Sequence, residues 1–386
     1  MVRLFFPIIC ITFLLSCSKT DGDTEKQSDI QLDTSALYSC ESDAILLFRG
    51  ETDEYAEFRL PTIIEDGNGV ISVFAEGRHT QSDWGDIDIV MKKSEDGGKT
   101  FGEMRVIKND GENKCGDPTP VYDDVRKRIL LIYRWGIAGK TVKGFYRPKN
   151  SHDGLKFYVT YSSDGGETWS NDSDISYIVP ETVGSFSVGP VHAIQLKHQQ
   201  CQGRIVVPAY CTKNELYHSL TVYSDDGGKT WNTSNIVTAC HSDECTVTEL
   251  KDGTLLLSQR FNSNKNKDAD TTVPYRLRSW SKDFGKTWVN TQKSELIEPK
   301  CQASLLTVVN NGNLTDTLLF SNPYSDSIKC NLTLQISTDN GRSWLPFMLV
   351  NKKGQYSDLV QLDNNEFGIV YESYNTIKFS RFSINQ

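Results

Sequence analysis

The chain has 386 residues, of which 38% are hydrophobic and 24% charged, a balance that predicts a folded protein rather than a disordered one. Its 28 glycines, 4 methionines and 10% aromatic residues favour short strands and turns over a helical bundle. The net charge of −9 argues against a nucleic-acid-binding protein, and no apolar run after the first sixteen residues approaches the roughly 20 residues that span a bilayer.

The N-terminal segment has the pattern of an export signal. Residues 1–16 contain one charge, Arg3, followed by an apolar stretch too short for an ordinary membrane span. The stretch ends in LLSC, which is similar to the bacterial lipoprotein box, whose cysteine (here Cys17) becomes the acylated first residue of the mature protein. We therefore expect a signal peptide at 1–16, a flexible polar tether at 17–39 and an exported lipoprotein, held by its lipid in the periplasm or at the outer membrane or cell surface. An ordinary signal peptide with a chance cysteine is the alternative.

An eight-residue pattern, S-x-D-x-G-x-[TS]-[WF], occurs five times in the chain. The copies begin at residues 94, 162, 224, 281 and 337, so successive starts lie 68, 62, 57 and 56 residues apart. Each copy predicts a tight turn, in which the aspartate accepts hydrogen bonds from turn amides, the glycine takes a positive φ and the aromatic ring fills the layer beneath. Alternating, β-branched runs between the copies predict strands at 70–75, 129–133, 204–210, 254–259, 317–321 and 367–371.

Repeats at this spacing indicate a propeller or an array. Residues 40–386 contain close to six units, so the predicted fold is all-β, a six-bladed β-propeller with five Asp-box turns. The blade without the pattern is expected to close the ring by combining the C-terminal strands with an N-terminal strand near 44–49. No helical pattern of comparable quality is present.

Four short motifs carry polar side chains outside the repeats. They are FRLP at 58–61, EGR at 76–78 with Asp83 following, DE at 243–244 with Arg260 following, and YSDL at 356–359. With these motifs in this order, the sequence resembles the bacterial sialidases over about residues 45–380. The resemblance implies that 40–386 is the catalytic domain of an exo-α-sialidase, which hydrolyses terminal α-linked sialic acid with retention of configuration through a tyrosyl-enzyme intermediate.

The chemistry of a sialoside suits these residue types. Its anomeric carbon bears a carboxylate, which would repel a carboxylate nucleophile, whereas a tyrosine is neutral until a neighbouring base takes its proton. The resemblance implies Tyr356 as the nucleophile, Glu244 as the base that activates it and Asp83 as the general acid/base. Each also has a structural alternative, such as a core aromatic for Tyr356.

The resemblance also implies a set of substrate-binding residues. Arg59 and Arg260 match two members of an arginine triad that grips the substrate carboxylate, since a planar guanidinium binds a carboxylate with two hydrogen bonds. Glu372 matches the acid that orients Arg59. Arg78 matches a position near the 4-position of the sugar, and Asp117 is assigned to the same binding set.

Two positions depart from the family pattern. Where the third arginine is expected, the sequence has Lys329, which keeps the charge but loses the fork geometry, and Arg276 or Arg278 is the alternative donor. The region 189–193 (GPVHA) differs from the small, glycine-rich version that is usual in the family, and its His192 is assigned to the pocket for the N-acyl or glycerol arm. A hydrogen-bonded histidine at the rim is the other interpretation.

These departures leave two alternative functions open: a related glycosidase or trans-sialidase with altered acid-sugar specificity, and a catalytically silent, sialic-acid-binding propeller. The retention of Tyr356, Glu244 and Asp83 argues against the second. The chemistry requires no cofactor, and no acidic loop of the EF-hand kind or Cys/His spacing indicates a metal site. The expected partners are sialylated glycans, with no nucleic acid, and the disulfide pairing stays open.

Overall fold

A computed structural model of the chain describes residues 38–39, 43–51, 54–140, 154–239, 241–262 and 275–384. The predicted signal peptide, Cys17 and nearly all of the predicted tether lie outside the described residues. All the described residues belong to one compact unit, Gln31–Gln386, which is the second unit of the chain. Within this described part, no helix has both the length and the apolar character needed to cross a membrane.

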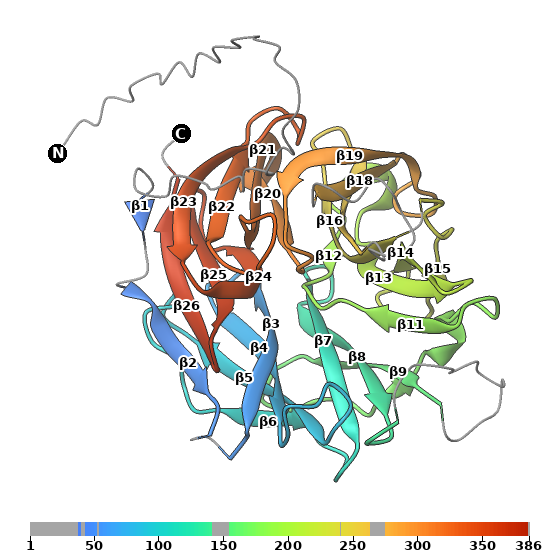
Figure 1. The fold of residues 1–386 in the computed structure, drawn as a ribbon, viewed down its shortest axis with the longest axis vertical. Coiled ribbons are helices and arrows are strands. Elements are labelled where there is room, and N and C mark those ends of the chain that lie inside the picture. Colours follow the sequence, from blue (N-terminus) through green and yellow to red (C-terminus); the bar gives the residue numbers. More distant parts are fainter. Residues whose placement is uncertain are drawn as a thin grey trace, which may run out of the picture. The chain divides into compact units, whose positions relative to one another are not determined.

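The second unit is an all-β propeller, in which five sheets surround a common centre (Figure 1). In chain order, the largest sheet contains β3 (Glu57–Glu65), β4 (Ile71–Arg78), β5 (Ile87–Ser94), β6 (Arg105–Lys108), β7 (Lys114–Asp123), β8 (Arg128–Gly136), β9 (Lys156–Ser162) and β10 (Ser173–Asp174). The next contains β11 (Ser185–Val188), β12 (Ile194–Gln195), β13 (Ile205–Lys213), β14 (Leu216–Ser224) and β15 (Asn232–Thr233). Two short 3₁₀ helices, Ser176–Ile178 and Gln199–Cys201, lie in the connections.

The remaining sheets complete the ring. One contains β16 (Ser242–Glu249), β17 (Leu255–Phe261), β18 (Tyr275–Ser281) and β19 (Val289–Ile297). Another contains β20 (Ser304–Asn310), β21 (Asn313–Pro323), β22 (Leu332–Ser337), β23 (Leu345–Asn351) and β1 (Tyr38–Ser39). The last contains β24 (Gly354–Gln361), β25 (Glu366–Ser373), β26 (Thr376–Ser383) and β2 (Ile45–Arg49). The antiparallel pairing of β2 with β26 confirms the expected closure between the two ends of the domain.

Each predicted strand run lies on one strand, and none extends beyond its strand by more than one residue; the strands are β4, β8, β13, β17, β21 and β25. Apart from β1, which pairs with β23 in parallel, strands that pair with one another within a sheet are antiparallel. The largest sheet has one exception, since its two halves, β3–β6 and β7–β10, join only through a single parallel pair, Ile87 with Lys114. Strands β3, β7, β16, β20 and β24 contact one another around the centre, so residues at their ends can converge.

The five repeated segments follow β5, β9, β14, β18 and β22. In every one the serine hydroxyl donates to the aspartate over 2.7–2.9 Å, and the glycine N–H donates to the same serine. That glycine has φ between 79° and 88° in all five, a conformation that costs a side-chain-bearing residue energy. At Gly98, an added Cβ would also lie 2.7 Å from the ring of Phe379. The pattern therefore builds the turns that lead from these five strands to β6, β10, β15, β19 and β23.

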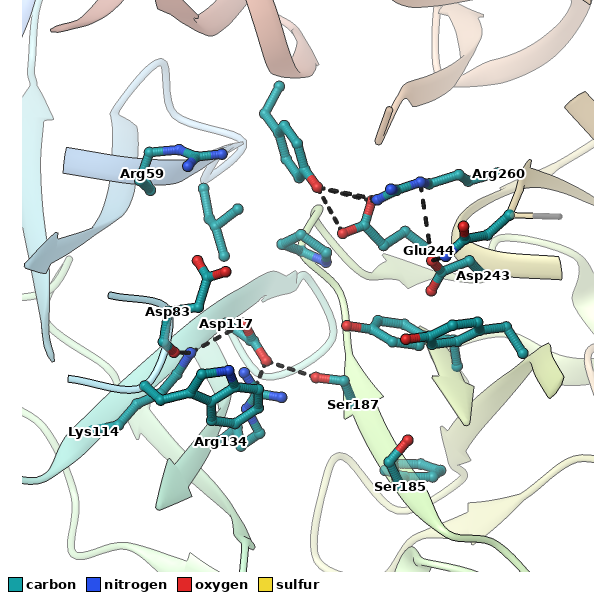
Figure 2. A pocket seen from close by; sticks show the side chains of 18 of the residues that line it. Arg59, Asp83, Lys114, Asp117, Arg134, Ser185, Ser187, Asp243, Glu244 and Arg260 are labelled. Atoms are coloured by element: carbon teal, nitrogen blue, oxygen red, sulfur yellow. Dashed lines mark hydrogen bonds and ion pairs between the residues drawn. The ribbon is translucent and has the colours of Figure 1, made fainter. Parts of the chain in front are cut away.

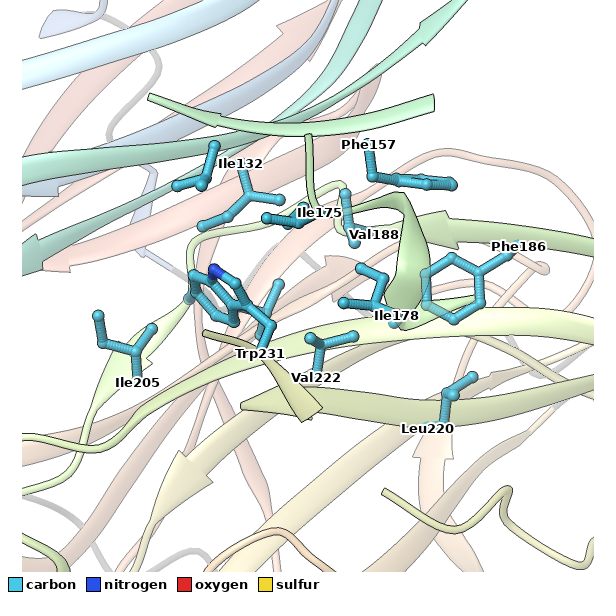
Figure 3. Close-up of a cluster of buried hydrophobic side chains, with 14 of the residues drawn as sticks. Ile132, Phe157, Ile175, Ile178, Phe186, Val188, Ile205, Leu220, Val222 and Trp231 are labelled. Atoms are coloured by element: carbon cyan, nitrogen blue, oxygen red, sulfur yellow. The ribbon is translucent and has the colours of Figure 1, made fainter. Parts of the chain in front are cut away.

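The aromatic residue that ends each repeat packs inwards. Figure 3 shows Trp231 among Ile132, Ile205 and Val222, in a cluster that joins side chains of the largest sheet with those of the β11–β15 sheet. Only 3% of Trp231 is exposed. Its indole N–H donates to the carbonyl of Gly228, so the ring also fixes its own turn. Apolar layers of this kind hold adjacent sheets together.

Replacement of Trp231 by alanine should therefore lower the free energy of unfolding by about 3–5 kcal/mol, the usual cost of removing a buried tryptophan. Denaturant unfolding measures this loss. Trp280→Ala is the matched control, because Trp280 is only half-buried and should cost less. Equal losses for the two variants would contradict the packing role of Trp231.

Candidate active site

A cavity of about 440 Å³ opens where the inner strands converge (Figure 2). Its walls carry six cationic side chains and four carboxylates. The cations are Arg59, Arg78, Lys114, Arg134, Arg260 and Lys329. The carboxylates are Asp83, Asp117, Asp243 and Glu244. An excess of positive charge in one cavity of a chain with a net charge of −9 favours an anionic ligand.

Tyr356, Glu244 and Arg260 form a close group at one wall. The Tyr356 hydroxyl donates to Glu244 Oε1 over 2.8 Å, and Arg260 Nη1 donates to Glu244 Oε2 over 2.6 Å and to the Tyr356 oxygen over 3.3 Å. Burial raises the pKa of Tyr356 well above its ordinary value, and the charge of Glu244 adds to this effect. The phenol is therefore neutral in the free protein, and its proton already points at a base.

Arg59 approaches the same tyrosine from β3. Its Nε donates to Glu372 Oε1 over 2.8 Å, and Glu372 also accepts from the backbone N–H of Leu60. Glu372 holds the pKa of Arg59 above its ordinary value. Leu60 has φ of 53°, a left-handed conformation that is strained for leucine and that the Glu372 contact helps to hold.

Lys329 reaches the cavity from the loop between β21 and β22. Its Nζ lies 4.9 Å from the centre of the Tyr356 ring, and Cζ of Arg59 lies 5.5 Å from it. Three cations, Arg59, Arg260 and Lys329, thus surround one phenol. The alternative donors lie elsewhere: Arg276 is fully buried in an ion pair with Glu298, Arg278 donates to the carbonyl of Gly341, and neither lines the cavity.

Asp83 lies on the loop between β4 and β5, across the cavity from Glu244 (Figure 2). Its side chain is 68% exposed, and Arg78 Nη1 donates to it over 2.7 Å. Lys114 Nζ donates to the Asp83 carbonyl over 3.0 Å and also lies 5.4 Å from the centre of the Trp84 ring. The loop backbone is therefore anchored, while the carboxyl group, which bonds Arg78, is exposed to a ligand.

Asp117 faces the cavity from a bulge in β7, where its φ is 54°. Its carboxylate accepts from Ser187 over 2.6 Å and forms an ion pair of 2.8 Å with Arg134 Nε. Its backbone N–H donates to Glu76. These contacts hold Asp117 in place at the floor of the cavity.

His192 does not line the cavity, in contrast to the assignment from sequence. Its Nδ1 lies 2.7 Å from Asp358 Oδ1, and its backbone N–H bonds Asp358 Oδ2. Burial opposes its protonation, but Asp358 outweighs burial and raises the pKa of His192. The imidazole is only 8% exposed, so its position fits a structural histidine.

Several cavity residues were missed from the sequence. Lys114, Arg134, Tyr210 and Tyr217 lie on strands and belong to no short motif, so no pattern marks them. Asp243 could have been identified from the sequence, because it directly precedes Glu244 in the DE motif. Its Oδ2 accepts from Asn262 over 2.7 Å and lies 3.9 Å from Arg260 Nε. Burial, and then Glu244, raises the pKa of Asp243 to about 6.

One group of potential metal ligands occurs among the described residues. Ligand atoms of His79, Asp86 and Asp88 lie within 4.8 Å of one another, at the base of the loop that carries Asp83. Asp88 already accepts hydrogen bonds from Tyr55 and Asn109. The contacts of His79, Asp86 and Asp88 therefore fit a structural role, in which they stabilise the base of the loop.

The fold and the site together define a β-propeller protein with a cationic cavity around a tyrosine–glutamate pair. A model of the BNR repeat-like domain matches residues 69–370, and the chain belongs to this family. Of curated proteins, a sialidase of Bacteroides fragilis is 29% identical over 83% of this chain and 61% of its own length. A sialidase of Micromonospora viridifaciens is 28% identical over 86% of this chain and 52% of its own length. The chain thus spans about half to three-fifths of the length of these two relatives.

The propeller is similar to a solved structure described as a Hadza microbial sialidase. The TM-score is 0.78 at 24% identity, and the match covers 88% of this chain and 68% of the other. At this identity the likeness concerns the fold.

The raised pKa of Asp243 has a consequence for stability. The folded protein binds this proton more tightly than the unfolded chain does, so the contribution of Asp243 to stability is present at low pH and is lost as pH rises through about 6. Asp243→Asn should therefore raise the melting temperature at pH 7.5, and the gain should shrink towards pH 5. Asp316→Asn is the control, since Asn340 and then Lys251 lower the pKa of Asp316. A gain that is independent of pH would contradict the assignment.

Proposed function

We propose that this protein is an exo-α-sialidase that releases terminal α-linked sialic acid from glycoconjugates. The observation that carries the proposal is the hydrogen bond of 2.8 Å between the Tyr356 hydroxyl and Glu244, inside a cavity rich in cations. A sialoside presents a carboxylate at its anomeric carbon, so cations beside the nucleophile suit this substrate. The similarity to curated sialidases of Bacteroides fragilis and Micromonospora viridifaciens supports it.

In the proposed mechanism, Arg59, Arg260 and Lys329 bind the substrate carboxylate. Glu244 takes the phenolic proton as the Tyr356 oxygen attacks the anomeric carbon, and Asp83 gives a proton to the departing glycosidic oxygen. Water, deprotonated by Asp83, then breaks the tyrosyl–sugar bond, and the proton on Glu244 returns to the phenol. Two displacements at one carbon give retention of configuration.

The finer architecture belongs to the same proposal. The single parallel pair between β5 and β7 marks a boundary between two blades, β3–β6 and β7–β10, which would bring the number of blades to six. The five repeated turns are then Asp boxes, and the sheet of β2 and β24–β26 is the closing blade without one. A lipid on Cys17 would hold this domain at the cell envelope, where sialylated glycans are its substrates.

A silent binding propeller is the weaker candidate. Binding of an anion needs the cations of the cavity, but it does not need a base within 3 Å of a buried phenol. Lys329 favours a different variation, a changed preference among acid sugars, because an ammonium group lacks the two-pronged geometry of guanidinium.

The direct test is release of sialic acid from a fluorogenic sialoside by the protein without residues 1–36. Tyr356→Phe should lower kcat by at least about a thousandfold, because it removes only the nucleophilic oxygen. Affinity for a dehydrated sialic acid analogue, measured by calorimetry, should change little. Sugar binding without any release by the unaltered protein would contradict the proposal.

Asp83→Asn tests the acid role separately. Turnover of a sialoside with a sugar leaving group should fall by about 100-fold or more, whereas an activated phenol, which departs without protonation, should be affected much less. The comparison of kcat/KM for the two substrates measures the difference. Equal losses on both would remove Asp83 from the role of general acid.

A further inference from the structure

Asp243 is a cavity residue whose carboxylate is only partly satisfied. The residue is 4% exposed, and its Oδ2 accepts from Asn262. Its Oδ1 is buried and has no hydrogen-bond partner in the described structure. Nε of Arg260, which lies 3.9 Å from Oδ2, is likewise without a hydrogen bond.

This arrangement is costly for the free protein. A buried acceptor without a donor keeps the desolvation cost that a hydrogen bond would offset. The neighbouring carboxylate of Glu244 adds repulsion, and the single guanidinium of Arg260 already bonds Glu244. Burial of the charge, and then the repulsion by Glu244, raises the pKa of Asp243 to about 6, although Arg260 and Asn262 act against the shift.

We propose that Asp243 is a specificity-determining residue, whose free Oδ1 accepts a hydrogen bond from a hydroxyl group of the bound sugar. The proposal rests on the function proposed above and adds a contact to it. Figure 2 shows Asp243 on the wall of Glu244 and Arg260, apart from Asp83, Lys114 and Arg134. The contact therefore lies beside the nucleophile, away from the leaving-group side.

The charges and donors around Asp243 indicate which group of a ligand can bind to its Oδ1. Two adjacent carboxylates repel an anion, and Asn262 and Arg260 already supply fixed donors to the other oxygens. A neutral hydroxyl can donate to Oδ1 without adding charge. Esterification of that hydroxyl removes the donor and adds bulk, so the site should discriminate against sugars that are O-acylated at this position.

The experiment removes each partner of the proposed hydrogen bond separately: the Asp243 carboxylate by substitution, and the hydroxyl group by a change of substrate. Sialosides with one common leaving group are compared as the intact sugar, as a 4-deoxy sugar and as a sugar whose glycerol arm has been shortened by periodate oxidation and reduction. All three keep the carboxylate, so the arginine contacts are unchanged. kcat/KM is measured for the unaltered protein, Asp243→Ala, Asp243→Asn and the control Asp316→Asn, which lies outside the cavity.

The unaltered protein and Asp316→Asn should lose about 10- to 100-fold on the substrate that lacks the recognised hydroxyl, the value of a hydrogen bond to a charged group. On the intact sugar, Asp243→Ala should lower kcat/KM by a similar factor. On the substrate that lacks the recognised hydroxyl, the same variant should show no further decrease. Asp243→Asn keeps an acceptor, so its kcat/KM on the intact sugar should lie between the values of the unaltered protein and Asp243→Ala. Which deleted substrate shows the coupling identifies the hydroxyl.

Equal losses by Asp243→Ala on all three substrates would overturn the proposal, because the residue would then act only through Glu244 or Arg260. Thermal melting identifies variants that fail to fold. If Asp243→Ala does not fold, the same comparison is made with Asp243→Asn, which preserves the shape of the side chain. If the unaltered protein releases no sialic acid, the proposed function fails by itself. Calorimetric affinities of free sialic acid and its two deleted forms for the unaltered protein and Asp243→Asn then test the contact, and identical ratios would overturn it.

Discussion

One fully buried carboxylate at the centre of the propeller, that of Asp358, holds together the strands that carry the site. It accepts hydrogen bonds from Ile63 N–H on β3, from Ser304 Oγ on β20 and from His192. Because a buried carboxylate is stable only when its lone pairs are satisfied, these segments must approach it together. Tyr356 lies two residues before Asp358 on β24, so the same contacts set the position of the phenol.

The rest of the cavity follows from charge compensation. Guanidinium and ammonium groups at the inner ends of the strands would be expensive to bury alone, and each described one has a carboxylate or a carbonyl nearby or faces the Tyr356 ring. Arg59, Arg260 and Lys329 thus line the cavity around a neutral phenol. Arg260 lies beside the Tyr356 oxygen, and its charge lowers the cost of deprotonating the phenol towards Glu244.

Backbone strain is concentrated at the same place. Leu60 and Asp117 both have φ above 50°, and both flank cavity side chains on bulged strands. In each case a buried glutamate accepts the backbone N–H: Glu372 at Leu60 and Glu76 at Asp117. Strain of this kind persists only where surrounding contacts hold it, and here it redirects Arg59 and Asp117 into the cavity.

The amino-acid sequence by itself determined the strand pattern, the turns of the five repeats and the order of the motifs, because these depend on short-range chemistry: alternation along a strand, a glycine at positive φ, an aspartate that accepts turn amides. It also marked Arg59, Glu244, Arg260 and Tyr356 through their neighbours in the motifs. Only the tertiary structure decided which polar residues meet. Lys114 and Arg134 reach the cavity, Lys329 rather than Arg276 faces the tyrosine, and His192 turns away to Asp358. These outcomes depend on contacts between residues far apart in the chain, such as His192 and Asp358, which are 166 positions apart. The closure of the ring brings such residues together, and no local pattern encodes it.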